Sequence, residues 1–334
     1  MITIIIPTLN AEGCLGKLFE TIQNQSPKID EVIIVDSSSE DNTVPRAKEF
    51  GATVMVIPRN EFDHGATRTF AGKRAHGDIL IYMTQDALLT DEHSIKNLVR
   101  PFYLYADMGA TYGRQLPYLN ASPFGAHLRY FNYPPHSYIT AIGDKEKYSI
   151  KTAFLSNSFA AYRKKALEEV DWFKENIILG EDTYAGAKLL LSGHKLAYVA
   201  EATVYHSHNY SLGMEFKRYF DIGVFHKAEH WILTKFGKAT GAGFKYIASE
   251  LSYLLEHKQY HLIPQSFLRS GLKFTGYVFG KNYDKLPTNI IKRLSMHGSW
   301  WNREKRNEIH NELFRGEVSV KKSFDNRQKG PRRG

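Results

Sequence analysis

The chain has 334 residues, 43% of them hydrophobic, so it can bury a substantial core and is not expected to be disordered as a whole. Its single cysteine, Cys14, excludes an intramolecular disulfide, and no apolar run approaches the about 20 residues needed to span a bilayer. The formal net charge of +9 is concentrated in residues 213–334, which carry 23 Lys or Arg against 11 Asp or Glu. Nucleic acid or an anionic membrane would suit this basic part, although a solvated face without a partner is the simpler interpretation of charge alone.

Over residues 1–105, predicted strands alternate with predicted helices. Short apolar, β-branched runs indicate strands at 2–6, 32–35, 52–57 and 79–83. The segments between and after these runs indicate helices at 15–22, up to residue 50, at 65–75 and at 91–105. This order is typical of βαβ units with right-handed crossovers, so we predict an α/β fold with a mostly parallel sheet flanked by helices.

The pattern is less regular after residue 101. We predict strands at 108–112, 158–162, 196–199 and 203–205, and a helix that begins with the residues Gly180-Glu-Asp182. Residues 118–150 contain three prolines without clear periodicity and are predicted to form an irregular insertion over the sheet. A change in composition near Ser211 predicts a first domain at 1–211, a mainly helical basic region at 212–320 and a disordered basic tail at 321–334.

Polar residues follow several of the predicted strands directly. Pro7, Thr8 and Asn10 follow the first strand, Asp36 follows the second, and Thr84-Gln85-Asp86 follows the strand at 79–83. Ligands of open α/β sheets bind at the carboxyl ends of the strands. A carboxylate there can accept hydrogen bonds from a pyrimidine or a ribose, or hold a divalent cation that bridges a diphosphate. Asp86 also has a structural alternative, because Asp is a favoured N-cap for a helix such as the one predicted at 91–105.

Two common nucleotide-binding motifs are not present. No Gly-x-Gly-x-x-Gly follows the first strand, which argues against a dinucleotide dehydrogenase. Residues 65–74 have too wide a glycine spacing for a P-loop, and Arg74 stands where Ser or Thr would hold magnesium. The polar strand ends therefore remain the candidate nucleotide site.

Several segments, taken together and in order, resemble a known family. Residues 7–10 (Pro-Thr-Leu-Asn), residues 35–43 (Val-Asp-Ser-Ser-Ser-Glu-Asp-Asn-Thr) and Gly77-Asp78 leading into Asp86 resemble the nucleotide-sugar-binding pattern of family 2 glycosyltransferases, which have the Rossmann-like GT-A fold. More narrowly, residues 62–68 (Phe-Asp-His-Gly-Ala-Thr-Arg), 84–87 (Thr-Gln-Asp-Ala), 112–117 (Tyr-Gly-Arg-Gln-Leu-Pro) and 205–210 (Tyr-His-Ser-His-Asn-Tyr) resemble bacterial enzymes assigned as rhamnosyltransferases. The general resemblance covers residues 1–210, and the narrower one extends to His226.

The resemblance implies a role for each residue of the site. Asp36 would bind the base or the ribose, and Asp86 would be the remaining acidic residue of an Asp-x-Asp metal motif whose first position is Thr84. Asp182, in a Glu-Asp pair, would be the general base. The implied set comprises catalytic Asp182 and Glu181; donor-binding Pro7, Thr8, Asn10, Asp36, Ser38, Arg68, Thr84, Gln85 and Asp86; acceptor-binding Arg114 and Gln115; and a Mg²⁺ or Mn²⁺ site at Asp86 and His206, with His208 nearby.

Structural interpretations stand beside several of these roles. Acidic residues such as Glu181 and Asp182 are also favoured at the start of a helix. Cations on the segment 65–75, namely Arg68, Lys73 and Arg74, are candidates to neutralise a departing diphosphate, but they equally suit a solvated helix face. His206 and His208 follow a predicted strand, where a histidine that is hydrogen-bonded in a structural role is nearly as common as a metal ligand.

A second motif points to a different chemistry. The segment His226-Lys-Ala-Glu229-His230 fits the His-x-x-Glu-His pattern of inverted zinc peptidases, in which two histidines bind zinc and the glutamate activates water. The pattern leaves two of its five positions free, and nothing nearby marks a third ligand. We therefore keep a zinc peptidase only as an alternative.

The resemblance leads us to expect an inverting glycosyltransferase that moves a deoxyhexose, L-rhamnose from dTDP-rhamnose, to a hydroxyl of a bacterial surface polysaccharide, which could be lipid-linked. Such an enzyme would work in the cytoplasm, and the basic, aromatic C-terminal helices would hold it on the anionic inner face of the membrane. A UDP-hexose donor is the alternative within the class. A non-catalytic polyanion-binding protein is the alternative outside it, but it leaves Asp86 and Asp182 unexplained, and no nucleic-acid partner is expected.

Overall fold

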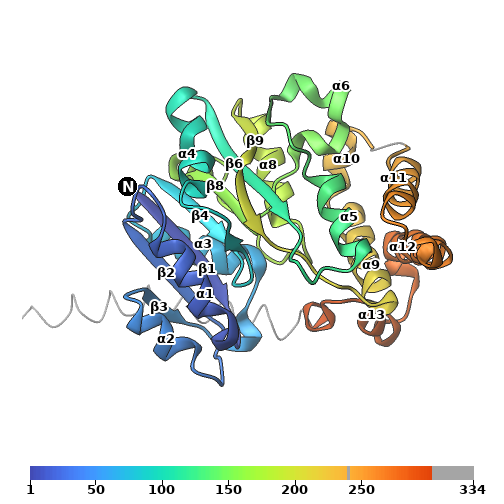
Figure 1. Ribbon diagram of the computed structural model, residues 1–334, viewed down its shortest axis with the longest axis horizontal. Helices are drawn as coiled ribbons and strands as arrows, with labels where there is room; N and C mark the ends of the chain where they lie inside the picture. The colour runs from blue at the N-terminus through green and yellow to red at the C-terminus, as the bar shows by residue number, and fades with distance from the viewer. Residues whose placement is uncertain (239–240, 303–334) are drawn as a thin grey trace, which may run out of the picture.

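The computed structural model describes residues 1–238 and 241–302, so the tail predicted at 321–334 lies outside the described residues. A nine-stranded sheet runs through the molecule in the order β3-β2-β1-β4-β8-β6-β9-β5, with β7 paired to β9 (Figure 1). Its strands are β1 (Ile2–Thr8), β2 (Glu31–Asp36), β3 (Thr53–Val56), β4 (Ile79–Met83), β5 (Leu88–Leu89), β6 (Met108–Leu116), β7 (Tyr138–Thr140), β8 (Phe159–Arg163) and β9 (Lys195–Tyr205).

Most strands run in one direction. β1 is parallel to β2 and β4, β2 to β3, and β6 to β9. β8 lies between β4 and β6 and is antiparallel to both, so β4 and β6 again share a direction. The predicted α/β class and the mostly parallel sheet are confirmed.

Helices cover both faces of the sheet, because alternate residues of the buried strands point to opposite sides. Ile4 and Ile6 of β1 pack with α1 and α4 in one core cluster, whereas Ile5 packs in a second cluster with α8 and α9. The helices are α1 (Glu12–Gln23), α2 (Thr43–Glu49), α3 (His64–Arg74), α4 (Ser94–Leu104), α5 (Pro123–Asn132), α6 (Lys145–Tyr148), α7 (Lys164–Glu169), α8 (Glu181–Leu191), α9 (Leu212–Ala228), α10 (His230–Phe236), α11 (Ala242–Glu256), α12 (Ile263–Lys281) and α13 (Thr288–Leu294).

Two local predictions are wrong. Residues 118–150 are not an irregular insertion, because they contain α5, α6 and the strand β7, which pairs with β9 through Ile139 and Ala197. The strands predicted at 196–199 and 203–205 are one strand, β9, whose pairing with β6 shifts register between Gly113 and Arg114. Short edge strands and irregular pairings leave little periodicity in a sequence, because only part of each strand faces a core.

The C-terminal helices begin at Leu212, where the Ser211 hydroxyl accepts a hydrogen bond from the backbone of Met214. α9 lies closely along α12, and a Cβ atom at Gly280 would come within 1.9 Å of the Phe220 carbonyl oxygen. Phe220 is fully buried in the cluster that also contains residues of the sheet. Figure 1 shows α11, α12 and α13 on the side of the molecule away from β2 and β3.

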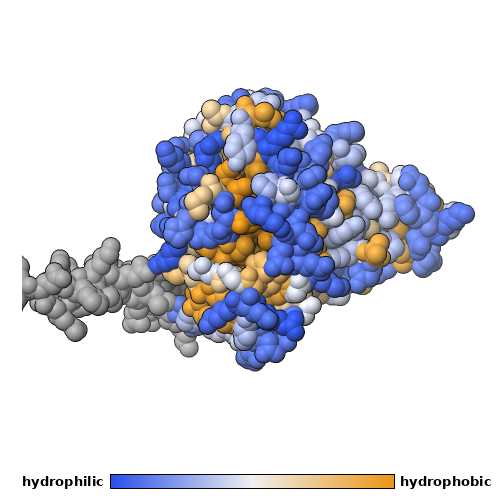
Figure 2. All heavy atoms as spheres, turned by 60° about the vertical axis from the view of Figure 1, so that its left-hand side comes forward, coloured by the Kyte–Doolittle hydropathy of each residue, from blue (hydrophilic) through white to orange (hydrophobic). Residues whose placement is uncertain are grey.

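Exposed hydrophobic residues gather in two regions of the surface. The face in Figure 2 is largely hydrophilic, with a band of hydrophobic residues down its middle. Exposed large hydrophobic side chains are also frequent on α11 and α12: Phe244, Leu255, Phe267, Leu268, Phe274, Val278 and Phe279. None of the helices within residues 1–238 and 241–302 combines the length and the apolar character that a membrane span requires.

Candidate active site

The predicted site residues converge on one edge of the sheet. The carboxyl ends of β1, β2, β4, β6 and β9 share this edge because the strands run in the same direction. The start of β8 joins them, since the antiparallel pairing places Phe159 opposite Met83, the last residue of β4. This edge is where ligands bind in open α/β sheets.

The loops after β1, β2 and β4 are held together around Asp36. This carboxylate is fully buried and accepts hydrogen bonds from the Thr8 hydroxyl (2.9 Å) and from the backbone and hydroxyl of Ser39 (2.8 and 2.6 Å). The side-chain amide of Gln85 pairs with the backbone of Leu9 through both its oxygen (2.9 Å) and its nitrogen (3.2 Å). The structure thus brings the ends of β1, β2 and β4 into one cradle.

Asn10 and Ser38 shape the rim of this cradle. Both have a positive φ, of 48° and 56°, a conformation that Asn tolerates better than most residues. The side-chain oxygen of Asn10 accepts from the backbone N–H of Glu40, and the Ser38 hydroxyl donates to the backbone carbonyl of Ile57. Pro7 lies beside Val35 in the β1–β2 register. Six of the predicted donor residues in these three loops therefore lie together: Pro7, Thr8, Asn10, Asp36, Ser38 and Gln85.

Asp86 lies opposite two histidines that follow β9. The His206 Nε2 atom is 3.5 Å from Asp86 Oδ1, and the His208 Nδ1 atom is 3.9 Å from Asp86 Oδ2. One ligand atom from each of the three residues lies within 4.8 Å of the others, which is a geometry that can hold a metal ion. The helix-cap alternative for Asp86 is wrong, because Asp91 accepts the backbone N–H of His93 just before α4.

The charge state of this cluster suits a cation. Desolvation acts to raise the pKa of Asp86, but hydrogen bonding to His206, the charge of His206 and the neighbouring Thr84 hydroxyl hold it well below its usual value. Burial and the adjacent His206 lower the pKa of His208 to about 4, so its ring is neutral near pH 7. One carboxylate and two imidazoles form a donor set that binds Mn²⁺ and related divalent ions.

Gln115 is not placed for its predicted contact with an acceptor, whereas the acceptor role of Arg114 stays a prediction. Gln115 is 1% exposed, and its amide contacts Arg129, Ser156 and His206. The Arg114 Nε atom donates to the carbonyl of Tyr133 (3.2 Å). Gln115 therefore supports His206 from behind instead of offering a free polar group.

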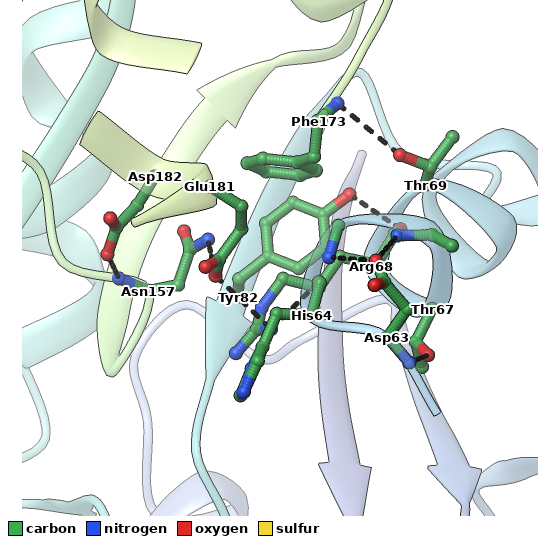
Figure 3. Close-up of polar contacts among 12 residues, drawn as sticks. Asp63, His64, Thr67, Arg68, Thr69, Tyr82, Asn157, Phe173, Glu181 and Asp182 are labelled. Carbon is green, nitrogen blue, oxygen red and sulfur yellow. Dashed lines mark hydrogen bonds and ion pairs between the residues drawn. The ribbon is translucent and has the colours of Figure 1, made fainter. Parts of the chain in front are cut away.

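The second half of the site is the start of α8, where Asn157 contacts both acidic residues (Figure 3). The Asn157 side chain donates to Glu181 Oε1 (3.0 Å), and its backbone N–H donates to Asp182 Oδ2 (3.2 Å). Desolvation and the nearby charge of Glu181 raise the pKa of Asp182 to about 7. A carboxylate with this pKa is suited to accept a proton at neutral pH.

Arg68 is paired with Glu181 and is not free to meet a diphosphate. The two side chains are 3.2 Å apart and nearly inaccessible, and Arg68 also donates to the carbonyl of His64 (Figure 3). Although desolvation opposes it, the charge of Arg68 lowers the pKa of Glu181. The prediction that Lys73 and Arg74 neutralise a diphosphate is wrong. α3 ends at these residues and leads to the amino end of β4, at the opposite edge of the sheet.

Replacing Arg68 with Met is expected to cost about 3–5 kcal/mol of unfolding free energy, because it leaves the Glu181 charge buried without its partner. Urea unfolding would measure the change. The matched control is Arg46→Met, which breaks an Arg–Glu pair at the same 3.2 Å distance with the Arg side chain 47% exposed. We expect less than about 1 kcal/mol there. Equal losses in both variants would contradict the role of burial.

Sequence reasoning missed the residues that connect the two halves. Ser156 accepts from Gln115 on the metal side, and the next residue, Asn157, holds the acidic pair. The available signal was the polar run Ser156-Asn157-Ser158 just before a predicted strand. Its meaning depends on the antiparallel direction of β8, which places a strand start at this edge.

The zinc-peptidase motif does not form a metal site. α9 ends at Ala228 and α10 begins at His230, so the two histidines do not lie one turn apart on a continuous helix. Glu229 contacts Lys174 (2.5 Å) and the Trp231 ring nitrogen (3.0 Å), and His226 contacts the Tyr277 hydroxyl (3.1 Å).

Comparison with known proteins agrees with this geometry. Residues 3–171 match the family model of glycosyl transferase family 2. The O-antigen chain rhamnosyltransferase RfbN of Salmonella typhimurium is 44% identical over 305 residues, which cover 90% of this chain and 96% of RfbN. The chain belongs to glycosyl transferase family 2. The O-antigen chain rhamnosyltransferase WbaN of Salmonella anatum is 40% identical over 90% of this chain and 95% of its own length. The chain is thus a glycosyltransferase, and the peptidase and non-catalytic alternatives are wrong.

Solved structures of glycosyltransferases share the fold. A mannosyltransferase from Pyrobaculum calidifontis, PcManGT, in complex with GDP-Man and Mn²⁺, superposes with a TM-score of 0.59 at 14% identity, covering 85% of this chain and 88% of PcManGT. TarS residues 1–349 from S. aureus, in complex with UDP-GlcNAc, superpose with a TM-score of 0.53 at 14% identity, covering 85% and 91%. The predicted GT-A fold of this family 2 member, with its helical C-terminal region, is confirmed.

Proposed function

We propose that this family 2 glycosyltransferase moves L-rhamnose from dTDP-rhamnose to a hydroxyl of a growing bacterial surface polysaccharide, with inversion at the anomeric carbon. The observation that carries the proposal is the 44% identity to RfbN over 96% of that protein, which is named as an O-antigen chain rhamnosyltransferase. The cradle around Asp36 supports a nucleotide donor, because its polar loops meet at the edge where such ligands bind.

Asp182 is the proposed general base. The acceptor oxygen bonds to the anomeric carbon while the bond from that carbon to the diphosphate oxygen breaks, and the bonding electron pair leaves with dTDP. Asp182 takes the proton of the acceptor hydroxyl in the same step, since the hydroxyl becomes acidic as it attacks. Its position at the start of α8, held by Asn157 and by the backbone of Thr183, keeps the carboxylate fixed for this transfer.

Asp86, His206 and His208 would hold a divalent cation. The lowered pKa of Asp86 and the neutral ring of His208 fit this role, and imidazole ligands compensate for Thr84, which stands where a second acidic ligand would be. When bound, such an ion neutralises charge on the departing diphosphate. Mn²⁺ and Mg²⁺ are the ions we propose.

The rate of transfer is expected to rise with pH through about 7, because Asp182 must be ionised to act as a base. Glu181→Gln removes the negative charge that helps to raise the pKa of Asp182. The ionised form of Asp182 is then favoured, so the rising limb of the profile should move to lower pH. Profiles of kcat/KM for the two proteins would measure this, and a limb that stays in place would show that another group titrates.

A donor screen tests the proposed substrate. Purified full-length enzyme with Mn²⁺ would be assayed for hydrolysis and transfer with dTDP-rhamnose, UDP-glucose, UDP-galactose and UDP-GlcNAc. We expect dTDP-rhamnose to be preferred by at least about tenfold in kcat/KM, which corresponds to about 1.4 kcal/mol. A preference for a UDP-hexose would reject the donor and favour the alternative within the class.

We also propose that the enzyme works in the cytoplasm and docks on the anionic inner face of the membrane through α11 and α12. Phe267, Phe274 and Val278 are spaced 7 and 4 residues apart, so they share one face of α12, and all three are exposed. Exposed cations accompany these helices and the segment after them: Lys245, Lys258, Lys285, Lys292 and Arg293. Apolar side chains inserted at the interface and cations near anionic headgroups act together in such docking.

Phe267→Ser with Phe274→Ser is expected to reduce sedimentation of the enzyme with phosphatidylglycerol vesicles at least about tenfold, because two inserted rings are lost. The control is Tyr103→Ser on α4, which removes a ring that is 73% exposed elsewhere. Transfer to a short acceptor without lipid should be unchanged in both. Equal vesicle binding by wild type and the double variant would reject the docking face.

A further inference from the structure

The contacts of Gln115 determine how its buried amide is oriented. The Arg129 Nη1 atom donates to Gln115 Oε1, and a guanidinium has donors only. The Gln115 atom that faces Arg129 must therefore be the carbonyl oxygen and not the amide nitrogen. The opposite atom, Nε2, donates to the Ser156 hydroxyl (2.8 Å), which agrees with this orientation.

The same oxygen determines the proton position on His206. Gln115 Oε1 is 2.9 Å from His206 Nδ1, and a carbonyl oxygen can only accept. Nδ1 must then carry the hydrogen, and in a neutral imidazole Nε2 carries the lone pair. His206 is 5% exposed, so these protein contacts govern its orientation. The other ring nitrogen, Nε2, lies 3.5 Å from Asp86 Oδ1.

A lone pair that faces a carboxylate oxygen is unfavourable unless a positive charge lies between them, either a proton on Nε2 or a metal ion that takes its place. With the opposite tautomer, Nε2–H would donate to Asp86, and the two residues would form a hydrogen bond without need of an ion. The Arg129–Gln115 contact disfavours that tautomer, because two acceptor atoms would then face each other at Nδ1 and Oε1.

We propose that Arg129 and Gln115 are positioning residues that keep a hydrogen on Nδ1 of His206, so that Nε2 faces Asp86 and is the ring nitrogen available to a divalent cation. This inference rests on the cation site proposed above. Arg129 comes from α5 and Gln115 from β6, so a helix and a strand outside the donor cradle prepare the ring for its role. Partners behind a metal-binding histidine typically change metal affinity by about 10–100-fold.

The tautomer can be read in metal-free, full-length protein labelled with ¹⁵N-histidine. The His206 ring signals are assigned by their loss in His206→Asn, and long-range ¹H–¹⁵N correlations at pH 8 identify which nitrogen is protonated. We expect the Nδ1–H form. A ring protonated at Nε2 alone would overturn the inference, and this measurement does not depend on whether a metal binds.

The consequence for metal affinity is tested by titrating the protein with Mn²⁺ alone. The decrease of the EPR signal of the free ion measures how much Mn²⁺ is bound. Gln115→Met removes the acceptor and should weaken Mn²⁺ binding by about 10–100-fold, whereas Gln115→Glu keeps an oxygen for both donors and should stay within about threefold of wild type. Unchanged affinity in Gln115→Met, or equal losses in both variants, would overturn the positioning role. No Mn²⁺ binding by wild type would reject the cation site, and the tautomer experiment would then show separately whether the Gln115 contact is as inferred.

Discussion

Asp182→Asn is expected to reduce kcat for sugar transfer by about 10²–10⁴-fold while leaving the affinity for dTDP-rhamnose nearly unchanged. The amide keeps the shape of the side chain, and its single oxygen can still accept from one of the two backbone N–H groups, of Asn157 and Thr183, that bond to different oxygens of Asp182. It cannot accept the proton of the acceptor hydroxyl. Single-turnover transfer and calorimetric binding of the donor to the same protein would separate the two effects.

Glu168→Gln is the control for this experiment. Glu168 is an exposed carboxylate on α7, so its replacement changes the net charge by the same amount without touching the site. We expect wild-type rates in that variant. Retained transfer in Asp182→Asn would remove Asp182 as the base, whereas a parallel loss of donor binding would show that the residue acts on the donor side.

Asp86→Asn is expected to abolish Mn²⁺ binding and to lower transfer by about 10²–10³-fold, because the only carboxylate of the three-residue cluster is lost. His206 and His208 would then be two neutral ligands without an anionic partner. Chelation of divalent ions should have a comparable effect on the wild-type enzyme, and readdition of Mn²⁺ should restore its activity. EPR detection of Mn²⁺ and donor turnover would measure the two outcomes.

Glu92→Gln provides the matched comparison for Asp86. This side chain is 66% exposed and lies shortly after Asp86 in the chain, but outside the cluster. It should bind Mn²⁺ and turn over like wild type. If Asp86→Asn retained full activity that still depended on Mn²⁺, the ion would have to bind elsewhere, and Asp86 would be left without its proposed role.

The cradle around Asp36 was predictable from local sequence. Runs such as 2–6 and 79–83 form strands because β-branched and apolar side chains suit a buried, pleated surface. Their direction follows from the crossovers, and the polar residues after them must then meet at one edge. For this reason Thr8, Asp36 and Gln85 lie together as expected.

The charges at the site were less predictable. Arg68 was expected at a diphosphate, but it is buried against Glu181, which comes more than a hundred positions later in the chain. Gln115 was expected to contact an acceptor, but it faces inward to Arg129 and His206. In both cases the residue type was consistent with the predicted role, and the burial that changes that role arises from packing between distant segments.

The sequence by itself determined the α/β class and the places where the buried strands end. Through the motifs that resemble those of family 2 glycosyltransferases, it also indicated Asp86 and Asp182 as the candidate acidic residues of the site. Only the tertiary structure decided which groups face them. His206 reaches Asp86 because β9 ends at the same edge as β4, and Asn157 reaches Asp182 because β8 runs antiparallel to its neighbours. Strand order and direction depend on pairings between distant segments, which local patterns of hydrophobicity do not encode. The pKa values of Asp86 and Asp182, shifted in opposite directions, follow from those pairings.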